Sequence, residues 1–169
     1  MLFISEADRD RTSLLIDIGY LNTDVMAVEG DAIIFHKTIP LGGGHISADL
    51  AYGLEVPLDS AEQIKRSFEF GPGSTKTSFD VTLSNGATET FSRDKVSEIL
   101  LPRVDEICEA IVQAVKESSV RLGNWSLVYL TGGGLAINKG GKEYLSEKME
   151  RPVRELPRKA VKLSSAIYS

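Results

Sequence analysis

Two short turns hold the residues best suited to chemistry, and each follows an apolar run of strand length. The first turn carries carboxylate, hydroxyl and amide side chains around one glycine, and its candidates are Asp17, Gly19, Asn22, Thr23 and Asp24. Glycine lets the backbone approach a ligand closely, and carboxylate oxygens are favoured ligands of Mg²⁺. The turn therefore suits a phosphate group and its magnesium ion. The alternative interpretation is a solvated hairpin turn in which both aspartates bond their own backbone.

The second turn contains Gly132, Gly133 and Gly134, directly after the apolar run 126–130. Three successive glycines allow the backbone to pack against a flat ring or a phosphate without side-chain clashes. The alternative is structural, because the same glycines also let a strand turn sharply into a helix.

The composition is that of a folded globular protein, since 42% of the 169 residues are hydrophobic and 25% are charged. The formal net charge is −5 and the basic residues form no run, which argues against nucleic acid as a partner. Cys108 is the single cysteine, which excludes an internal disulfide and fits a reducing compartment. No apolar stretch approaches the roughly 20 residues of a membrane helix. We expect a cytoplasmic protein without direct membrane contact from this chain.

The first part of the chain is predicted to form a three-stranded antiparallel meander over residues 14–18, 23–28 and 32–39. The glycine triplet 42–44 then opens a helix. A new unit is predicted from Pro57.

In that new unit, Asp59 and Glu62 fit a capping box at the start of a helix that runs to about Phe68. The capping role is one interpretation of Glu62, and an ordinary solvated helix position is the corresponding one for Lys65. Alternating residues on both sides of Asn85-Gly86 predict a β-hairpin, over 79–83 and 87–91.

A long amphipathic helix is predicted from Asp94, with apolar residues three or four positions apart. Pro102 falls inside this pattern, and we expect it to kink the helix or to divide it near Leu101. The remaining elements are predicted as a strand over 127–130, a helix over 136–149 and a short strand over 152–155.

With both turns and the segments between them, the chain resembles the second half of the FtsA family of cell-division proteins, in the actin, DnaK-type chaperone and sugar-kinase superfamily. The similar motifs are 39–49, 61–65 and 130–134. The resemblance implies an α/β fold, an actin-like ATPase domain with an RNase H-like mixed sheet flanked by helices and an inserted α+β lobe. The implied core lobe is 1–56 with 121–169, and the implied inserted lobe is 57–120.

The resemblance also implies one side of a cleft for ATP and Mg²⁺. Asp17 would lie near the metal, and the backbone of the first turn would meet the phosphates. Glu62 and Lys65 match the family's helical pair at the ribose and base, and the loop 132–134 matches its adenosine-side loop.

For partners, the resemblance implies actin-like self-association into filaments, and binding of the C-terminal tail peptide of the tubulin-like FtsZ to the inserted lobe. Candidate contacts for an acidic tail are the basic residues of that lobe, Arg66, Lys76, Arg93, Lys95 and Arg103. A solvated surface is the alternative interpretation for each of these side chains.

One departure from the family pattern lies in the first turn. Tyr20 and Leu21 occupy positions that are glycine in the family, and Asn22 replaces a hydroxyl residue. Their bulk would crowd the space for the β- and γ-phosphates, so we expect weak or absent triphosphate binding and ATPase activity. No catalytic residue is assigned.

Two alternative functions remain at this point. One is half of an ATPase or small-molecule kinase of the same superfamily, and the other is an adaptor of the pilus-assembly PilM type. Both ends of the chain, including the helix-like residues 161–169, fall where the FtsA family passes between its two halves. We therefore expect an excised domain.

Overall fold

The computed structural model describes residues 11–30, 32–83 and 86–156. Its main feature is a five-stranded sheet in the order β3-β2-β1-β6-β7. The strands are β1 (Ser13–Ile18), β2 (Thr23–Glu29), β3 (Ala32–Ile39), β6 (Leu127–Thr131) and β7 (Val153–Glu155). β1, β2 and β3 pair antiparallel, whereas β6 pairs parallel with β1 and with β7, so the sheet is mixed as predicted.

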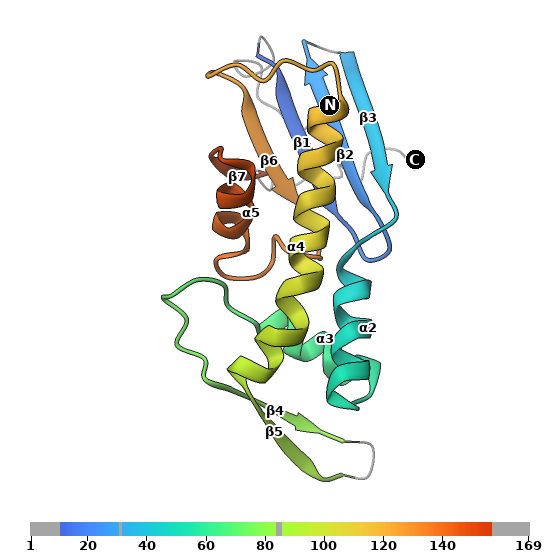
Figure 1. Ribbon diagram of the computed structural model, residues 1–169, viewed down its shortest axis with the longest axis vertical. Coiled ribbons are helices and arrows are strands. Elements are labelled where there is room, and N and C mark those ends of the chain that lie inside the picture. The colour runs from blue at the N-terminus through green and yellow to red at the C-terminus, as the bar shows by residue number, and fades with distance from the viewer. Residues whose placement is uncertain (1–10, 31, 84–85, 157–169) are drawn as a thin grey trace, which may run out of the picture.

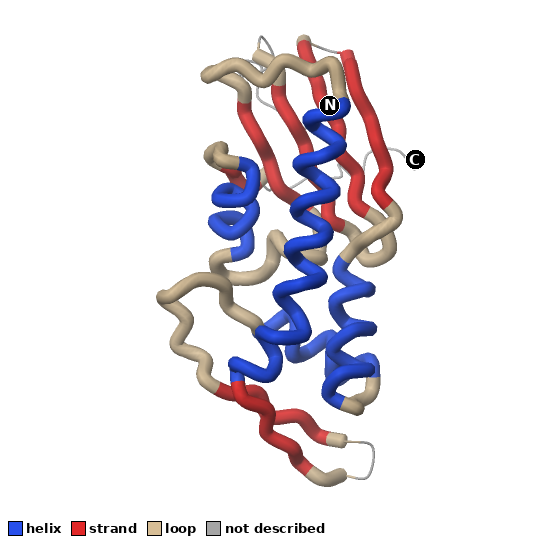
Figure 2. Tube along the Cα trace, viewed as in Figure 1, coloured by secondary structure: helices blue, strands red, loops and turns tan. Residues whose placement is uncertain are grey.

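The helices and the hairpin lie either beyond one end of this sheet or against it (Figures 1 and 2). They are α2 (Gly43–Leu54), α3 (Leu58–Ser67), α4 (Arg93–Glu117), α5 (Gly141–Met149) and the hairpin strands β4 (Ser78–Thr82) and β5 (Thr88–Ser92). α4 runs from the hairpin to one face of the sheet and contacts α2, β5, β2, β3 and α5. One helix therefore connects the core lobe and the inserted lobe, whose boundaries stay predictions.

The core lies where α4 covers the sheet. Alternate residues of β1, Leu14, Ile16 and Ile18, point to this side and are at most 1% exposed. They belong to the same buried cluster as Ile107 and Ile111 of α4. Apolar residues recur every two positions in the strand and every three to four positions in the helix. Each element therefore has one apolar face, and the two faces pack against each other. None of the helices in the part of the chain that the structure describes has the length and apolar character needed to cross a membrane.

Pro102 was expected to kink the long helix or to divide it, and the division is wrong, because α4 is one continuous helix of 25 residues with Pro102 inside it. Pro102 removes the N–H that would bond the carbonyl of Glu98. Both residues are exposed, so water can take the place of that donor. The neighbouring Leu100 and Val104 are buried in the core, and their packing favours continuity over a break.

The predicted capping box of α3 is also wrong. The helix begins at Leu58 after Pro57, and no side chain caps it. Asp59 lies inside the first turn, and Glu62 bonds elsewhere. The predicted helix over 136–149 starts only at Gly141, because Gly140 has a φ of 79° and ends the preceding turns.

Stability at the end of α5 provides a test of local backbone conformation. Glu150 closes this helix in the left-handed conformation, with a φ of 53°. We expect Glu150→Gly to stabilise the protein by about 0.5–1 kcal/mol, because glycine adopts this conformation without steric cost. Thermal unfolding would show it as a Tm higher by roughly 1–4 °C. Glu147→Gly, an exposed position inside the same helix, should instead lower the Tm; an equal effect at both positions would contradict the explanation.

Candidate functional site

The first predicted turn is a tight hairpin between β1 and β2. The Gly19 N–H donates to the Asn22 carbonyl at 2.9 Å, which closes the turn. Asp17 and Asp24 are directly paired across the two strands, so their carboxylates belong to one side of the sheet. Partial burial, and the negative charge of Asp24 nearby, raise the pKa of Asp17. Asp17 is therefore the carboxylate of this pair that would gain most from a cation.

Asp24 is already satisfied by its neighbours. Its carboxylate accepts hydrogen bonds from Thr38 at 2.5 Å, from Asn22 at 2.9 Å and from the His36 ring at 3.0 Å. The bonds from Thr38 and His36 lower the pKa of Asp24 despite partial desolvation. The predicted residues Asn22 and Asp24 thus bond each other and β3. Sequence reasoning missed His36 and Thr38 as members of this group, although the meander pairs Thr38 with Asp24.

The start of α2 packs directly against the hairpin turn. The N–H groups of Gly43 and Gly44 donate to the carbonyls of Gly19 and Tyr20 at 2.8 and 2.7 Å. The first amides of a helix are ordinarily free to bind an anion. Here the turn carbonyls accept two of them. Thr23, whose hydroxyl donates to the Leu41 carbonyl at 2.8 Å, fixes the same connection from the other side.

The loop 132–134 packs on the end of β1. The Gly134 N–H donates to the Ile18 carbonyl at 2.8 Å. Gly132 has a φ of 91°, and a Cβ placed on it would lie 2.3 Å from the Ile18 carbonyl oxygen and 2.4 Å from Oδ1 of Asp17. Only glycine fits this position. The close approach of Gly132 to Asp17 also shows that the two predicted turns lie next to each other. Gly133 is exposed.

Glu62 and Lys65 form an ion pair that is mostly removed from solvent. The Lys65 ammonium, with its side chain 3% exposed, donates to Glu62 at 2.6 Å and to the Gly43 carbonyl at 3.0 Å. Ser47 and Arg66 also donate to the Glu62 carboxylate. Although partial burial favours the neutral acid, these hydrogen bonds lower the pKa of Glu62 overall. The pair links α3 to the start of α2.

Tyr20 covers this pair from the solvent side. Its ring centroid lies 5.7 Å from the Lys65 ammonium, within cation–π distance. The ring also lies against the backbone of Gly44, since a Cβ placed there would be 2.7 Å from the ring edge. Tyr20 and Leu21 remain 51% and 68% exposed. Both bulky side chains therefore project from the turn.

Asn138 holds the glycine loop in place, and sequence reasoning missed it. Its buried side-chain amide donates to the carbonyls of Lys65 and Phe68 at 2.6 and 2.9 Å. This joins the segment after the glycines to the end of α3. A buried amide with two backbone partners is not recognisable from spacing, because its partners lie about 70 positions away in the chain.

These contacts fit a bound nucleotide poorly. Asp17 and the glycine backbone suit a cation and a flat group, but the groups expected at the ribose and phosphates already bond each other. Within the described residues, no three carboxylate, histidine or cysteine side chains are grouped closely enough to hold a metal ion. The structure does bring together the first turn, the start of α2, the pair Glu62–Lys65 and the loop 132–134.

The predicted basic contacts differ in their environments. Arg66 pairs with Glu62 at 2.8 Å, and Arg103 pairs with Asp49 at 2.6 Å and with Glu106. These two side chains therefore have structural partners. The other three have no carboxylate partner among the described residues and lie near phenyl rings: Lys76, Arg93 and Lys95.

Comparison with known proteins decides the family. The family described as "Cell division protein FtsA" matches residues 14–167. The chain belongs to the FtsA family. The FtsA of Bacillus subtilis is 27% identical over 138 residues, which are 79% of this chain and 31% of that protein. The FtsA of Neisseria meningitidis is 27% identical over 155 residues, 89% of this chain and 37% of that protein. The chain thus spans about a third of the length of these FtsA relatives.

Solved structures with a similar fold are actin-like proteins. MreB5 of Spiroplasma citri bound to AMPPNP gives a TM-score of 0.76 at 17% identity, covering 90% of this chain and 50% of MreB5. A PilM–PilN type IV pilus biogenesis complex gives 0.66 at 18% identity, covering 89% and 37%. A MamK double helical filament gives 0.66 at 18% identity, covering 86% and 49%. These likenesses confirm the predicted α/β, actin-like ATPase fold of this FtsA-family chain.

Proposed function

We propose that this chain is the second actin-like domain of an FtsA-type cell-division protein and that it binds the acidic C-terminal tail of a tubulin-like FtsZ. The family match supports the division role. A filament formed by the similarly folded MamK supports actin-like self-association as a further property. The observation that carries the tail-binding proposal is a row of three cations beside the hairpin that have no carboxylate partner among the described residues.

Each cation of this basic row lies over a phenyl ring. Arg93 lies 4.7 Å from the ring centroid of Phe68, Lys76 lies 4.8 Å from that of Phe79, and Lys95 lies 5.5 Å from that of Phe91. The rings are buried, and the charged ends that lie over them have no carboxylate partner in the described part of the chain.

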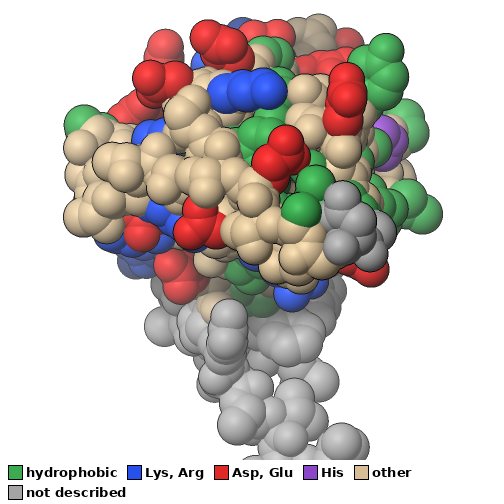
Figure 3. Space-filling model, turned by 90° about the horizontal axis from the view of Figure 1, so that it is seen from below, with side chains coloured by type: hydrophobic (Ala, Val, Ile, Leu, Met, Phe, Trp, Pro, Cys, Tyr) green, Lys and Arg blue, Asp and Glu red, His purple; other side chains and the backbone are tan. Residues whose placement is uncertain are grey.

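The backbone keeps these three cations adjacent. The Arg93 N–H donates to the Thr77 carbonyl at 2.9 Å, and its guanidinium donates to Ser74 at 2.8 Å. The segment around Lys76 therefore lies beside the start of α4. Seen from the hairpin end, uncharged surface dominates, and acidic and basic side chains are scattered across it (Figure 3). A docking tail would thus gain binding energy from a few specific contacts rather than from a broad positive field. With so few contacts, we expect micromolar affinity.

The test is an anisotropy titration of this chain with a labelled FtsZ C-terminal tail peptide from the same organism. We expect saturation near micromolar peptide and at least tenfold weaker binding, about 1.4 kcal/mol, for Lys76→Glu with Lys95→Glu. Lys116→Glu reverses a single charge at the other end of α4 and should leave the affinity unchanged, whereas Lys76→Glu or Lys95→Glu alone should weaken it. Equal binding by both variants, or no binding up to millimolar peptide, would reject the proposal.

A PilM-type adaptor is the second candidate, and the likeness to the PilM–PilN complex supports it. It would recognise a short peptide from a membrane partner instead of the FtsZ tail. Titration with such a peptide from the same organism separates the two functions. A PilM-type adaptor should bind this peptide with saturation, whereas an FtsA-type protein should bind the FtsZ tail with saturation.

We propose only weak nucleotide binding for this chain. The similarly folded MreB5 was solved with AMPPNP, and Asp17 with the loop 132–134 would contribute to the corresponding side of a cleft here. Glu62 and Lys65 already bond each other, and the Tyr20 ring lies beside Lys65. Fewer polar groups and less space therefore remain for a ribose and phosphates. The proposed state is therefore weak or absent binding of ATP and Mg²⁺, without an assigned ATPase mechanism.

A further inference from the structure

An apolar pocket lies where the ends of α4 and α5 meet the loop that follows α4. Its volume is about 250 Å³. Five of its lining residues are apolar and half-buried: Val112, Val115, Val120, Leu122 and Met149. A water-sized group occupies roughly 30 Å³, so the pocket has room for about eight methylene groups. It therefore has the size of a short alkyl chain.

Hydrogen bonds within the chain hold the walls of this pocket in place. The Ser118 hydroxyl donates to the Val115 carbonyl at 2.7 Å and accepts the Val120 N–H at 3.3 Å, which folds the loop back onto the end of α4. At the end of α5, the Ser146 hydroxyl donates to the Arg151 carbonyl at 2.7 Å, and the Arg151 N–H donates to the Ser146 carbonyl at 3.2 Å. The pocket is thus formed without a ligand, as is usual for small-molecule sites.

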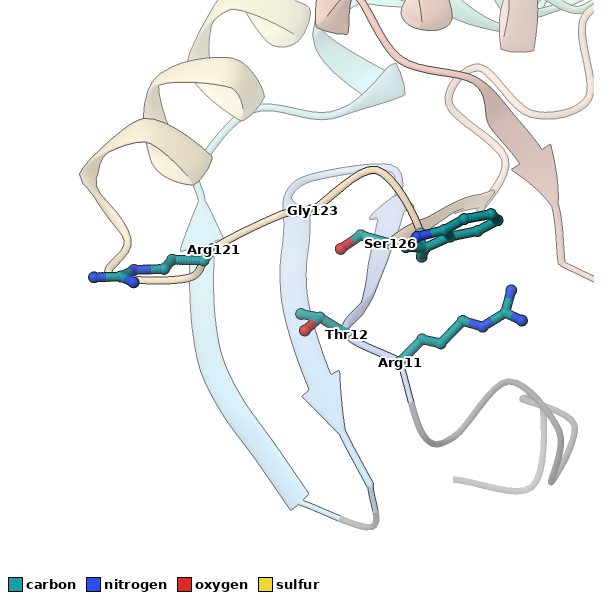
Figure 4. A pocket seen from close by; sticks show the side chains of 6 residues that line it. Arg11, Thr12, Arg121, Gly123 and Ser126 are labelled. Atoms are coloured by element: carbon teal, nitrogen blue, oxygen red, sulfur yellow. The ribbon is translucent and has the colours of Figure 1, made fainter.

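Two cations also line the pocket, and the position of one of them is fixed. The Arg151 guanidinium donates to the Leu122 carbonyl at 2.7 Å and to the Gly123 carbonyl at 3.0 Å. Gly123 lies in the loop that leads from α4 toward β6 (Figure 4). In the part of the chain that the structure describes, neither Arg151 nor Lys116 has a carboxylate partner. Both positive charges therefore remain available to an anion.

The helix ends beside the pocket oppose an anion only in part. The last turns of α4 and α5 each carry about half a negative charge, against the two full charges of Lys116 and Arg151. None of the described lining residues is acidic, and Glu117, the last residue of α4, is paired with Lys37 at 2.7 Å. The local balance therefore favours an anionic group, although the whole chain has a formal charge of −5.

The composition of the lining limits what the pocket can bind. Apart from Lys116 and Arg151, no described lining residue has a polar side chain. A hydroxyl or amide group inside the pocket would lose its water without finding a side-chain partner. Aliphatic side chains and the adaptable thioether of Met149 suit a flexible alkyl chain instead. The chemistry that fits is an apolar body with one anionic end.

A larger hollow of about 630 Å³ adjoins the same loop but does not offer such a site. Arg11 and Arg121 line it together with Trp125. The side chains of the two arginines point away from each other, on opposite sides of Thr12 and Ser126, so they do not converge on one anion (Figure 4). The smaller pocket is therefore the better candidate for an anionic ligand.

We propose that the pocket at the end of α4 binds a linear aliphatic carboxylate of about six to eight carbons. The alkyl chain lies among the five apolar residues. The carboxylate meets the fixed guanidinium of Arg151, with which it can form charge-assisted hydrogen bonds, and the exposed Lys116 adds attraction. This binding goes beyond the proposed recognition of the FtsZ tail, because the basic row lies beside the start of α4 and the pocket at its end.

The test is an NMR titration with octanoate of the full chain, labelled with ¹³C at the methionine methyl groups. The Met149 signal should shift and saturate, whereas the signal of Met26 in β2 should not move. Affinity should rise roughly fourfold for each methylene from butanoate to octanoate, the factor that burial of one CH₂ group supplies. Octylamine, with the same chain length and the opposite charge, should bind at least tenfold more weakly than octanoate.

Variants separate the charge from the apolar walls. Arg151→Gln should weaken octanoate binding at least fivefold, whereas Arg154→Gln, the same change at an exposed position of β7 outside the pocket, should bind as the wild type does. Lys116→Gln breaks no ion pair of the described residues, so its expected threefold loss tests the charge even if Arg151→Gln fails to fold. The proposal is overturned if octanol binds as tightly as octanoate, if folded variants bind like the wild type, or if no saturable Met149 shift appears up to about 10 mM octanoate.

Discussion

Replacing both Tyr20 and Leu21 with glycine should raise the affinity of this chain for ADP at least tenfold. The Tyr20 ring lies over Lys65 and against Gly44, so its removal opens the space next to the Glu62–Lys65 pair. Glycine also lets the turn backbone approach a diphosphate more closely. A tenfold gain corresponds to about 1.4 kcal/mol, and a titration with a fluorescent ADP analogue measures it.

Tyr20→Phe is the control for this prediction. It keeps the ring and its contact with the Lys65 ammonium, so ADP binding should stay as weak as in the wild type. Micromolar ATP affinity of the unmodified chain would contradict the prediction directly. A folded glycine variant without any gain would show that the paired Glu62 and Lys65, rather than Tyr20, limit binding.

Glu62→Ala should destabilise the fold by about 3–5 kcal/mol, because it leaves the Lys65 ammonium buried without its partner. Urea unfolding at neutral pH measures this loss. Glu62→Leu combined with Lys65→Met removes both charges and should recover most of the stability, since no buried charge then remains. Failure of the double variant to recover would mean that the pair is needed for packing rather than for charge balance.

The same pair predicts how stability depends on pH. The pKa of Glu62 is lower in the folded state than in the unfolded chain, so its contribution is fully present above the unfolded value. It is lost as the pH falls through the lower, folded value. Relative to Glu62→Ala, the wild type should therefore lose its advantage on acidification. Arg66→Ala, which removes only the exposed partner of Glu62, should cost at most about 0.5 kcal/mol at any pH.

The sequence by itself determined the elements and the family. Strands predicted at 14–18, 23–28 and 32–39 lie within one residue of β1, β2 and β3, because alternating apolar residues specify which face is buried. The glycine turns and motif order were sufficient to indicate an FtsA-like, actin-type fold. These signals are local, and each depends only on residues within a few positions.

Only the tertiary structure decided how the candidate residues are used. One interpretation had Glu62 cap its own helix, yet its carboxylate accepts a hydrogen bond from Ser47, which the packing of α2 on α3 brings next to it. Asn138 bonds carbonyls about 70 positions away, and Pro102 sits inside an unbroken helix because its neighbours are buried. Sequence patterns report local preference, whereas long-range packing sets which polar groups meet, and burial then decides how strongly they must pair.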